Sequence, residues 1–237
     1  MDSIMRYVLE SRGKRLRPIL TLFFAKLFGE VNERTMRVAT AMEVVHSASL
    51  VHDDVIDDDD ERRGKASVRV RFSNSSAVLA GDYLLTQALL ILSHPDSRDL
   101  LPEIVGTASA MIEGELMQSS GGQPCSDGVG AYLDIITRKT ARLIRSSCVA
   151  GAMSVNAPKD ALELVADFGI NLGIVFQMRD DILDADSPEI LSLAQSLLPS
   201  QLEKTLSALE VLSRVSDKAI FLKALSDLTY FCAQRLS

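Results

Sequence analysis

The sequence contains no tryptophan, and aromatic residues make up only 5% of its 237 residues. Proline is also scarce, with seven residues, and few segments alternate apolar and polar side chains as half-buried strands do. Alanine, leucine, serine and methionine are abundant instead, and 47% of the residues are hydrophobic. A chain of this length can bury one substantial core. These features predict an all-α protein with a single domain over residues 1–237.

Cysteine is nearly absent as well. The three cysteines, Cys125, Cys148 and Cys232, are odd in number and have no C-x-x-C spacing. This argues against a disulfide framework or a zinc site and favours reduced, buried thiols. The sequence shows no signal peptide and no uninterrupted apolar run that we expect to span a bilayer. We therefore expect a cytoplasmic protein without a transmembrane segment.

Positive charge is in deficit, and the formal net charge is −7. A nucleic-acid partner requires a basic face, so this balance argues against nucleic acid. The lysines and arginines that are present gather in three patches, GKRLR at 13–17, RRGK at 62–65 and RKTARLIR at 138–145. Local basic patches in an acidic protein suit a small polyanion that is bridged by metal.

The most informative stretch is residues 43–65, where an apolar helical run ends in a burst of acid. Asp53, Asp54 and Asp57 form a D-D-x-x-D motif. Positions four apart lie on nearly the same side of a helix, so these carboxylates can converge on one ion or ion cluster. They repel one another, and the negative end of the helix dipole adds to the repulsion. A cation is therefore expected beside them.

The same motif recurs downstream as Asp180, Asp181 and Asp184. A single D-D-x-x-D is a weak signal, because charge runs are usually solvated helix ends. Two copies, each at the end of a long apolar helical stretch, predict facing acid clusters that share divalent cations with an anionic substrate. Mg²⁺ is the expected ion, with Mn²⁺ as a substitute, because Mg²⁺ takes few carboxylates and completes its shell with water and phosphate oxygens.

Two other kinds of metal site fail on spacing. His46 follows Glu43 by three residues, the E-x-x-H spacing of di-iron bundles. Neither His52 nor His94 has a glutamate three residues before it, so the second half of a di-iron site is missing. The acidic run at 57–61 lacks the glycine-centred loop of an EF-hand.

Several helices are predicted from their start and stop signals. Pro18 suits the first turn of a helix that stops at Gly29. Asn32 is a candidate N-cap for the helix that leads to the first aspartates. Residues 75–93 are strongly apolar and are expected to form a helix at the centre of the bundle. Pro158 is expected to open the long helix that ends in the second motif.

Two pairs of residues have more than one interpretation. Lys14 and Arg17 lie at a helix junction, where they can bind a phosphate together with free backbone N–H groups; alternatively, they belong to a solvated basic turn. Ala48 and Ser49 lie five and four residues before Asp53. These small side chains either border the bound substrate or allow close helix packing.

Six motifs in the chain resemble, in the same order, those of the trans-isoprenyl diphosphate synthases, the polyprenyl synthetase family. They are GKRLRP, LVHDDVIDDDDERRGK, LAGDYLL, GELMQ, RKTA and FQMRDDILD, and the match spans about residues 5–186. The resemblance implies the all-α isoprenoid synthase fold, a helical bundle around a deep central cavity that is usually found in a homodimer.

The resemblance also implies an activity. It is the Mg²⁺-assisted condensation of isopentenyl diphosphate with an allylic diphosphate, such as geranyl or farnesyl diphosphate, to a trans-polyprenyl diphosphate. A weakly active or regulatory subunit of a heteromeric synthase is the alternative. A terpene cyclase is a third reading, but such an enzyme has no need of a second diphosphate site.

Site residues follow from the same resemblance. The metal-binding and catalytic carboxylates would be Asp53, Asp54, Asp57, Asp180, Asp181 and Asp184. Substrate would be bound by Arg62, Lys139, Thr140 and Gln177 on the allylic side and by Lys14, Arg17, His46 and Arg63 on the isopentenyl side. Ala48 and Ser49 would set chain length, and their small size resembles that of synthases whose products are longer than farnesyl diphosphate.

The chain departs from the family pattern in two places. Family members have helices before the first motif and a flexible glycine- and lysine-bearing loop after the second. Here ADSPEIL runs straight into a predicted helix, and no lysine occurs between Lys159 and Lys204. We therefore expect a domain that lacks N-terminal helices and the loop after Asp184. Arg179, beside the second motif, has no role in this interpretation.

Overall fold

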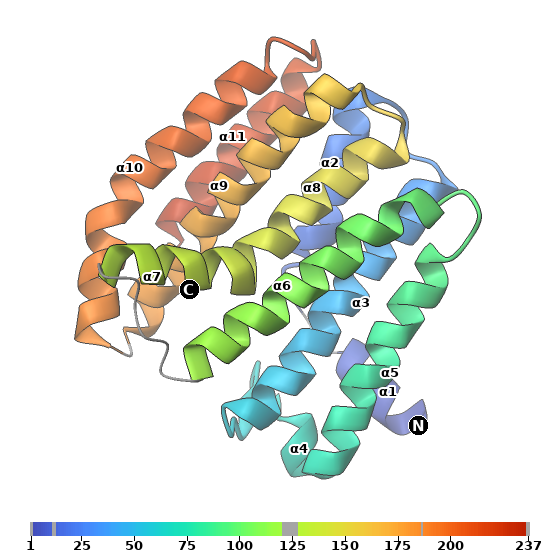
Figure 1. Ribbon diagram of the computed structural model, residues 1–237, viewed down its shortest axis with the longest axis vertical. Coiled ribbons are helices and arrows are strands. Elements are labelled where there is room, and N and C mark those ends of the chain that lie inside the picture. Colours follow the sequence, from blue (N-terminus) through green and yellow to red (C-terminus); the bar gives the residue numbers. More distant parts are fainter. Residues whose placement is uncertain (1, 11–12, 120–127, 186, 236–237) are drawn as a thin grey trace.

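The computed structural model describes residues 2–10, 13–119, 128–185 and 187–235. These residues form a bundle of helices together with one short hairpin. Figure 1 shows the long helices side by side, from α10 at one edge of the molecule to α5 at the other. The predicted all-α fold is confirmed.

The bounds of the elements are as follows. The helices are α1 (Asp2–Leu9), α2 (Leu16–Phe28), α3 (Glu33–Ile56), α4 (Val68–Arg71), α5 (Asn74–Leu92), α6 (Leu101–Ser119), α7 (Gly128–Ile136), α8 (Arg142–Ser154), α9 (Lys159–Asp184), α10 (Pro188–Leu212) and α11 (Ala219–Gln234). A 3₁₀ segment, η1 (Arg98–Leu100), precedes α6, and a π-helical segment, η2 (Thr137–Ala141), joins α7 to α8. Strand β1 (Glu61–Arg62) pairs antiparallel with β2 (Lys65–Ala66).

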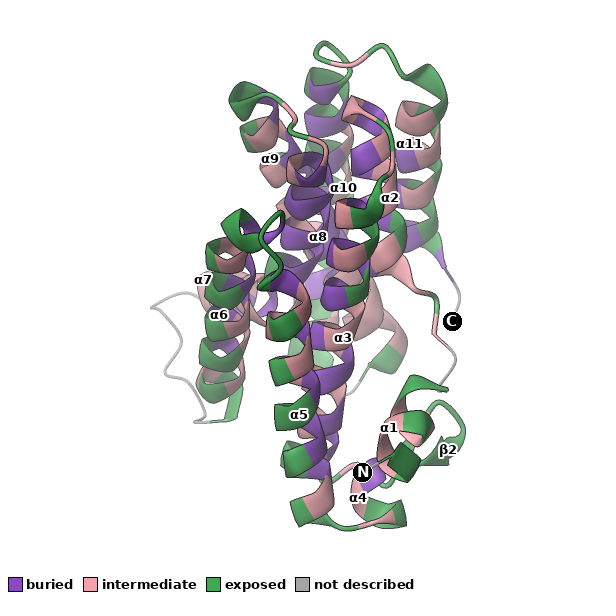
Figure 2. Cartoon of the chain, turned by 90° about the vertical axis from the view of Figure 1, so that its right-hand side faces the viewer, coloured by how far each residue is buried: buried purple, intermediate pink, exposed green. Residues whose placement is uncertain are grey.

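The core is divided between two main clusters. The larger lies where α2, α8, α9, α10 and α11 meet, and the rings of Phe24 and Phe168 pack there with centroids 5.7 Å apart. The second joins α3, α5, α6 and α8 around Met42 and Leu143, which are fully buried. Figure 2 shows the buried residues running along α3 and α8, with α1, α4 and β2 at one end of the molecule.

The helix signals in the sequence are confirmed. Pro18 lies in the first turn of α2, and Gly29 caps its C-terminal end. Asn32 caps α3 by accepting a 2.9 Å hydrogen bond from the Thr35 backbone N–H, while the Thr35 hydroxyl accepts from the Asn32 N–H. Pro158 precedes α9. These local interactions fix the residues at which α2, α3 and α9 begin. Helices α3 and α9 then lead directly into the two aspartate motifs.

The apolar helix predicted over residues 75–93 forms as α5, but it does not lie at the centre of the bundle. It packs against α3, and Leu79 and Leu90 on its outer face are 61% and 62% exposed. A helix that is apolar on every face was expected to be buried. The prediction was wrong because apolar composition does not reveal how many neighbours a helix has.

Two helices are long and apolar enough to cross a bilayer by length and composition alone, although neither is an uninterrupted apolar run of the kind sought in the sequence. Helices α5 and α9 each contain an 18-residue window with a mean hydropathy of 1.4. Core helices of soluble proteins meet the same criterion, and α9 packs between α8 and α10. The two helices are therefore weak evidence for a membrane span.

Two of the cysteines are described by the structure. Cys148 and Cys232 are buried free thiols, as predicted. Burial raises the pKa of both, that of Cys232 to about 11, so both stay protonated at neutral pH. Cys125 lies outside the described residues.

The π-helical segment η2 is held between two glycines. A Cβ atom at Gly173 of α9 would lie 2.5 Å from the Cα of Ala141, and one at Gly114 of α6 would lie 2.8 Å from the backbone nitrogen of Lys139. Only glycine allows approaches this close. π-Helical turns are rare and frequently occur at functional sites, and this one carries Lys139 and Thr140.

Candidate active site

Two adjoining cavities in the bundle contain most of the predicted site residues. The first, about 670 Å³, is lined by residues of α3, α6, η2 and α9, and we call it the α6 cavity. The second, about 740 Å³, is lined by residues of α2, α3, α9 and α11, and we call it the α11 cavity. Arg17, His46, Arg63 and Phe176 line both. The hollow that the resemblance implies is therefore present.

Acid from both motifs faces the α6 cavity. Asp53 near the end of α3 and Asp180 and Asp184 at the end of α9 line it. In the described ranges, no group of three or more His, Cys, Asp or Glu side chains is arranged to hold a metal ion. Carboxylates on separate walls nevertheless fit ions such as Mg²⁺, which take part of their coordination from water and phosphate oxygens.

The middle aspartate of each motif is directed elsewhere. Asp54 is 3% exposed and accepts a 2.6 Å hydrogen bond from Nε of Arg62. Asp181 accepts hydrogen bonds from the Tyr132 hydroxyl at 2.6 Å and from the Gln177 amide at 2.8 Å. These two side chains do not line the α6 cavity with Asp53, Asp180 and Asp184, and their predicted metal-binding role stays a prediction. Successive helix residues point about 100° apart, so the residue after a cavity-facing one turns away.

The charge around Asp53 is only partly compensated. Burial raises the pKa of Asp53 to about 6; Lys139 opposes this shift, whereas Glu115 and Asp57 add to it. Asp57 caps α3, with its backbone N–H 2.8 Å from the Asp53 carbonyl oxygen. Its exposed side chain does not line the α6 cavity, although Lys139 and Glu115 also influence its pKa. A carboxylate group with this excess of negative charge fits a divalent cation.

The residues predicted on the allylic side lie together. Lys139 forms an ion pair with Glu115, with Nζ 2.7 Å from Oε2. The hydroxyl of Thr140 donates to Oε1 of Gln177 at 2.7 Å. Lys139, Thr140, Gln177 and Glu115 all line the α6 cavity. No role was assigned to Glu115 from the sequence, although it belongs to the GELMQ motif.

The residues predicted on the isopentenyl side, Lys14, Arg17, His46 and Arg63, all line the α11 cavity. Arg17 is 8% exposed, and burial lowers its pKa to about 10. Its Nε atom finds no hydrogen-bond partner in the described part of the chain. A buried charge without full pairing is costly, so this arrangement favours phosphate binding over a solvated basic turn.

The β1–β2 hairpin places the two arginines of the first motif. Arg63 and Gly64 form its turn with φ of 55° and 74°, and positive φ at both positions is what a type I′ hairpin requires. Arg62, one residue earlier, bonds to Asp54 and lines the α6 cavity. A Cβ atom on Gly13 would lie 2.5 Å from the Arg63 guanidinium, so Gly13 makes room for Arg63.

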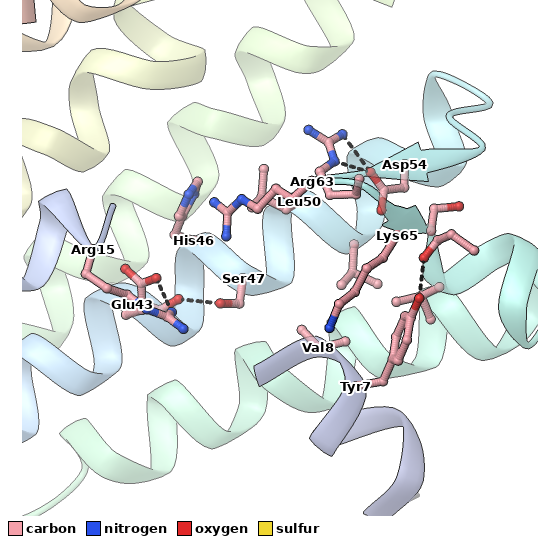
Figure 3. A pocket seen from close by; sticks show the side chains of 15 residues that line it. Tyr7, Val8, Arg15, Glu43, His46, Ser47, Leu50, Asp54, Arg63 and Lys65 are labelled. Atoms are coloured by element: carbon pink, nitrogen blue, oxygen red, sulfur yellow. Dashed lines mark hydrogen bonds and ion pairs between the residues drawn. The ribbon is translucent and has the colours of Figure 1, made fainter. Parts of the chain in front are cut away.

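His46 is an uncharged group between arginines. Burial lowers its pKa well below the usual value, and Arg17 and Arg63 lower it further. It can therefore offer hydrogen bonds at neutral pH without adding charge. Glu43, three residues earlier, is paired with Arg15 at 2.5 Å, and Figure 3 shows these two side chains directed toward each other beside His46.

The two small residues before the first motif have different surroundings. Ala48 is 4% exposed and packs in a cluster with Ala77 of α5. Ser49 lines the α6 cavity together with Ile112 and Leu116. The interpretation as close helix packing is therefore correct for Ala48, and a chain-length role remains a prediction for Ser49 alone.

Two arginines connect α9 to the segment after α11. Arg235 is 9% exposed, forms an ion pair with Asp180 and lies over the ring of Phe176, 4.2 Å from its centroid. Arg179 donates two hydrogen bonds, of 2.8 and 2.6 Å, to the backbone oxygen of Arg235. This gives Arg179 a structural role. Arg235 was missed because it lies outside every recognised motif.

Comparison with known proteins gives consistent matches. The chain matches the family model described as Polyprenyl synthetase over residues 1–191. It is 39% identical over 187 residues to heptaprenyl diphosphate synthase component 2 of Geobacillus stearothermophilus, covering 77% of this chain and 57% of that protein. The chain thus spans little more than half the length of that relative.

Solved structures with a similar fold are also known. A decaprenyl diphosphate synthase from Rhodobacter capsulatus has a TM-score of 0.87 and 25% identity, over 99% of this chain and 90% of the other. A polyprenyl synthase from Caulobacter crescentus, solved in complex with calcium and isoprenyl diphosphate, has a TM-score of 0.84 and 24% identity, over 100% and 89%. The isoprenoid synthase fold implied by the sequence is confirmed.

Proposed function

Because the chain belongs to the polyprenyl synthetase family, we propose that it is a prenyltransferase. It condenses isopentenyl diphosphate with an allylic diphosphate to a longer trans-polyprenyl diphosphate. One observation carries the proposal: aspartates of both motifs line the α6 cavity, whereas Lys14, Arg17 and Arg63 line the adjoining α11 cavity. A diphosphate with its metal ions suits the first, and a second diphosphate without metal suits the second.

The proposed cofactor is Mg²⁺, with Mn²⁺ as a substitute. Asp53 and Asp57 from α3 and Asp180 and Asp184 from α9 would hold it, because oxygen donors alone suit a hard cation. When bound, the metal would stabilise the negative charge of the departing diphosphate. We assign the middle aspartates, Asp54 and Asp181, to orienting Arg62 and Gln177, from which they accept hydrogen bonds, although the sequence also placed them in the metal-binding set.

On the allylic side, Arg62, Lys139 and Thr140 would bind the diphosphate. The allylic C–O bond breaks, and the diphosphate departs with the bonding electron pair, which leaves an allylic carbocation. Positive groups that are already in place stabilise the charge that develops on the leaving oxygen without having to reorganise. The double bond of isopentenyl diphosphate then forms the new C–C bond, and the proton lost from the isopentenyl unit goes to an oxygen of the departed diphosphate.

On the isopentenyl side, Lys14, Arg17 and Arg63 would bind the second diphosphate. The neutral His46 can donate a hydrogen bond to it. The apolar wall that Ile112 and Leu116 contribute to the α6 cavity would exclude water from the carbocation and receive the growing chain. The mechanism requires no protein nucleophile.

We further propose that residues 1–237 act as one domain and that the chain forms a homodimer in the cytoplasm. Exposed apolar side chains gather on α5 and α6, including Leu79, Leu90 and Val105 at 61%, 62% and 49% exposure. Apolar surface of this kind favours association. The buried free thiols of Cys148 and Cys232 suit a reducing compartment.

A second candidate function is that of a weakly active or regulatory subunit in a heteromeric synthase. The relative from Geobacillus stearothermophilus is named as component 2 of its enzyme, which suggests such a partner. In addition, only residues 185–187 separate α9 from α10, so no lysine-bearing loop follows the second motif.

One assay separates the candidates. The protein is incubated with Mg²⁺, labelled isopentenyl diphosphate and either geranyl or farnesyl diphosphate, and the lipid products are sized. Elongated products, abolished in an Asp53→Asn control, support the transferase. No incorporation contradicts it and favours the regulatory subunit, whereas cyclic hydrocarbons without incorporation indicate a terpene cyclase.

A further inference from the structure

A partly buried chain of hydrogen bonds runs behind the α6 cavity and connects α7, η2 and α9. Tyr132 donates to Oδ2 of Asp181 at 2.6 Å, and Gln177 donates through Nε2 to Oδ1 of Asp181 at 2.8 Å. Thr140 donates to Oε1 of Gln177 at 2.7 Å. Both carboxylate oxygens of Asp181 and both ends of the Gln177 amide therefore have partners within the protein.

We propose that Tyr132 is a positioning residue for the allylic substrate. By holding Asp181, it fixes the orientation of Gln177 and Thr140 at the wall of the α6 cavity, and it keeps Asp181 out of the metal-binding set. This inference rests on the proposed function, in which Thr140 and Gln177 lie on the allylic side. Tyr132 belongs to none of the six motifs in the sequence.

The surroundings of Tyr132 leave its hydroxyl group with one role. The residue is 7% exposed and packs in an apolar cluster with Ile136, Met178 and Ala194. A tyrosine hydroxyl in such a place needs a hydrogen-bond partner, and Asp181 provides one. The aromatic ring therefore fixes the position of the donor, and the donor in turn fixes the carboxylate.

The position of Asp181 on α9 agrees with this role. Asp180 and Gln177 line the α6 cavity, whereas Asp181 does not. Gln177 lies one helical turn before Asp181, so the two side chains are neighbours on the helix surface. Because Asp181 does not line the cavity and accepts a hydrogen bond from Gln177, it is placed to orient that neighbour rather than to bind a metal ion inside the cavity.

The first aspartate motif shows the same division of roles. Asp53 lines the α6 cavity, whereas the buried Asp54 accepts a hydrogen bond from Arg62, which itself lines the cavity. In each motif the leading aspartate faces the cavity and the middle aspartate orients a side chain in its wall. Asp181 orients Gln177 in the second motif as Asp54 orients Arg62 in the first.

The test compares Tyr132→Phe with Tyr230→Phe, a matched change at a tyrosine of α11 that is 42% exposed. Calorimetry measures the binding of an unreactive thio analogue of geranyl diphosphate, and separately of isopentenyl diphosphate, in the presence of Mg²⁺. We expect Tyr132→Phe to weaken binding of the analogue roughly tenfold, as losses of orienting partners do, and to leave isopentenyl diphosphate binding unchanged. Tyr230→Phe should change neither.

A second comparison tests the role of Asp181. Binding of Mn²⁺ in the presence of pyrophosphate is followed by electron paramagnetic resonance in Asp180→Asn and Asp181→Asn. We expect Asp180→Asn to lose affinity by about tenfold or more and Asp181→Asn to stay near the wild type. Equal losses in both variants would show that Asp181 is a ligand and would overturn the inference.

The other outcomes are equally decisive. If Tyr132→Phe binds the analogue as well as Tyr230→Phe does, or weakens both diphosphates equally, Tyr132 has no positioning role. These are binding measurements, so an inactive wild-type protein contradicts the proposed activity without affecting them. Failure of the wild-type protein to bind the analogue at all would contradict the proposed function itself.

Discussion

The guanidinium group of Arg235 forms an ion pair with the carboxylate of Asp180, across the boundary between the two cavities. Arg235 lines the α11 cavity and Asp180 lines the α6 cavity. Burial raises the pKa of Asp180, and Arg235 lowers it. Without metal, the guanidinium group of Arg235 therefore supplies positive charge beside the second aspartate motif.

Replacing Arg235 by glutamine should therefore destabilise the metal-free protein. We expect a loss of about 1.5–3 kcal/mol, the usual range for a hydrogen bond to a charged group, and a smaller loss with Mg²⁺ and pyrophosphate present. Urea unfolding in both conditions measures this. Arg214→Gln is the control, because the ion pair between Arg214 and Glu210 is exposed and 3.8 Å long. Equal effects of the two variants would contradict the prediction.

Asp53→Asn should stabilise the metal-free protein at neutral and alkaline pH. The pKa of Asp53 is raised to about 6 in the folded state, so the unfolded chain ionises first as the pH rises. Stability is therefore lost between the unfolded and folded pKa values and stays low above the folded one. The variant avoids this loss, which amounts to roughly 1–3 kcal/mol at about 1.4 kcal/mol per pKa unit.

The pH dependence of that gain provides the check. Denaturant unfolding of wild type and Asp53→Asn is compared at about pH 5 and about pH 8, and the gain should be larger at the higher value. A gain that is the same at both values would show that the charge of Asp53 is not its source. With saturating Mg²⁺ and pyrophosphate, the variant should instead be the less stable protein.

Gly173→Ala should displace η2. Its Cβ atom would lie 2.5 Å from the Cα of Ala141, and overpacking of this kind typically costs about 1–3 kcal/mol. Binding of the geranyl analogue should weaken with it, because Lys139 and Thr140 lie on η2. Gly106→Ala is the matched control, since a Cβ atom there meets nothing within 4 Å and alanine favours the helix. A Gly173→Ala protein as stable as this control would refute the close packing.

Ser49→Phe and Ala48→Phe should have different consequences. Ser49 lines the α6 cavity, so a phenylalanine there should shorten the products without lowering the unfolding temperature substantially. Ala48 of α3 is buried against α5, so the same change should destabilise the fold by about 1–3 kcal/mol. Product sizing and thermal unfolding of both variants distinguish these effects. If the wild-type protein makes no product longer than farnesyl diphosphate, the prediction that the small Ser49 side chain leaves room for longer chains is contradicted.

The features that the sequence predicts correctly are carried by local patterns. The Asn32 cap, the stop at Gly29 and the start of α9 after Pro158 depend on neighbouring residues alone. The convergence of Asp53 with Asp180 on one cavity was also predictable, because the same motif ends two long helices.

The features that were missed depend on distant parts of the chain. Arg235 lies 55 positions from Asp180, and no local pattern connects them. The π-helical turn requires Gly114 and Gly173 from two other helices, so no pattern within residues 137–141 indicates it. The exposure of α5 depends on how many neighbours it has, which apolar composition does not encode.

The central claim is that both aspartate motifs share one site for divalent metal and diphosphate. It is tested most directly by crystallography of the protein with Mn²⁺ and pyrophosphate, using anomalous scattering from manganese. We predict manganese peaks inside the α6 cavity, contacted by Asp53 from α3 and by Asp180 from α9. Peaks bound by one motif alone, or lying outside that cavity, would contradict the claim.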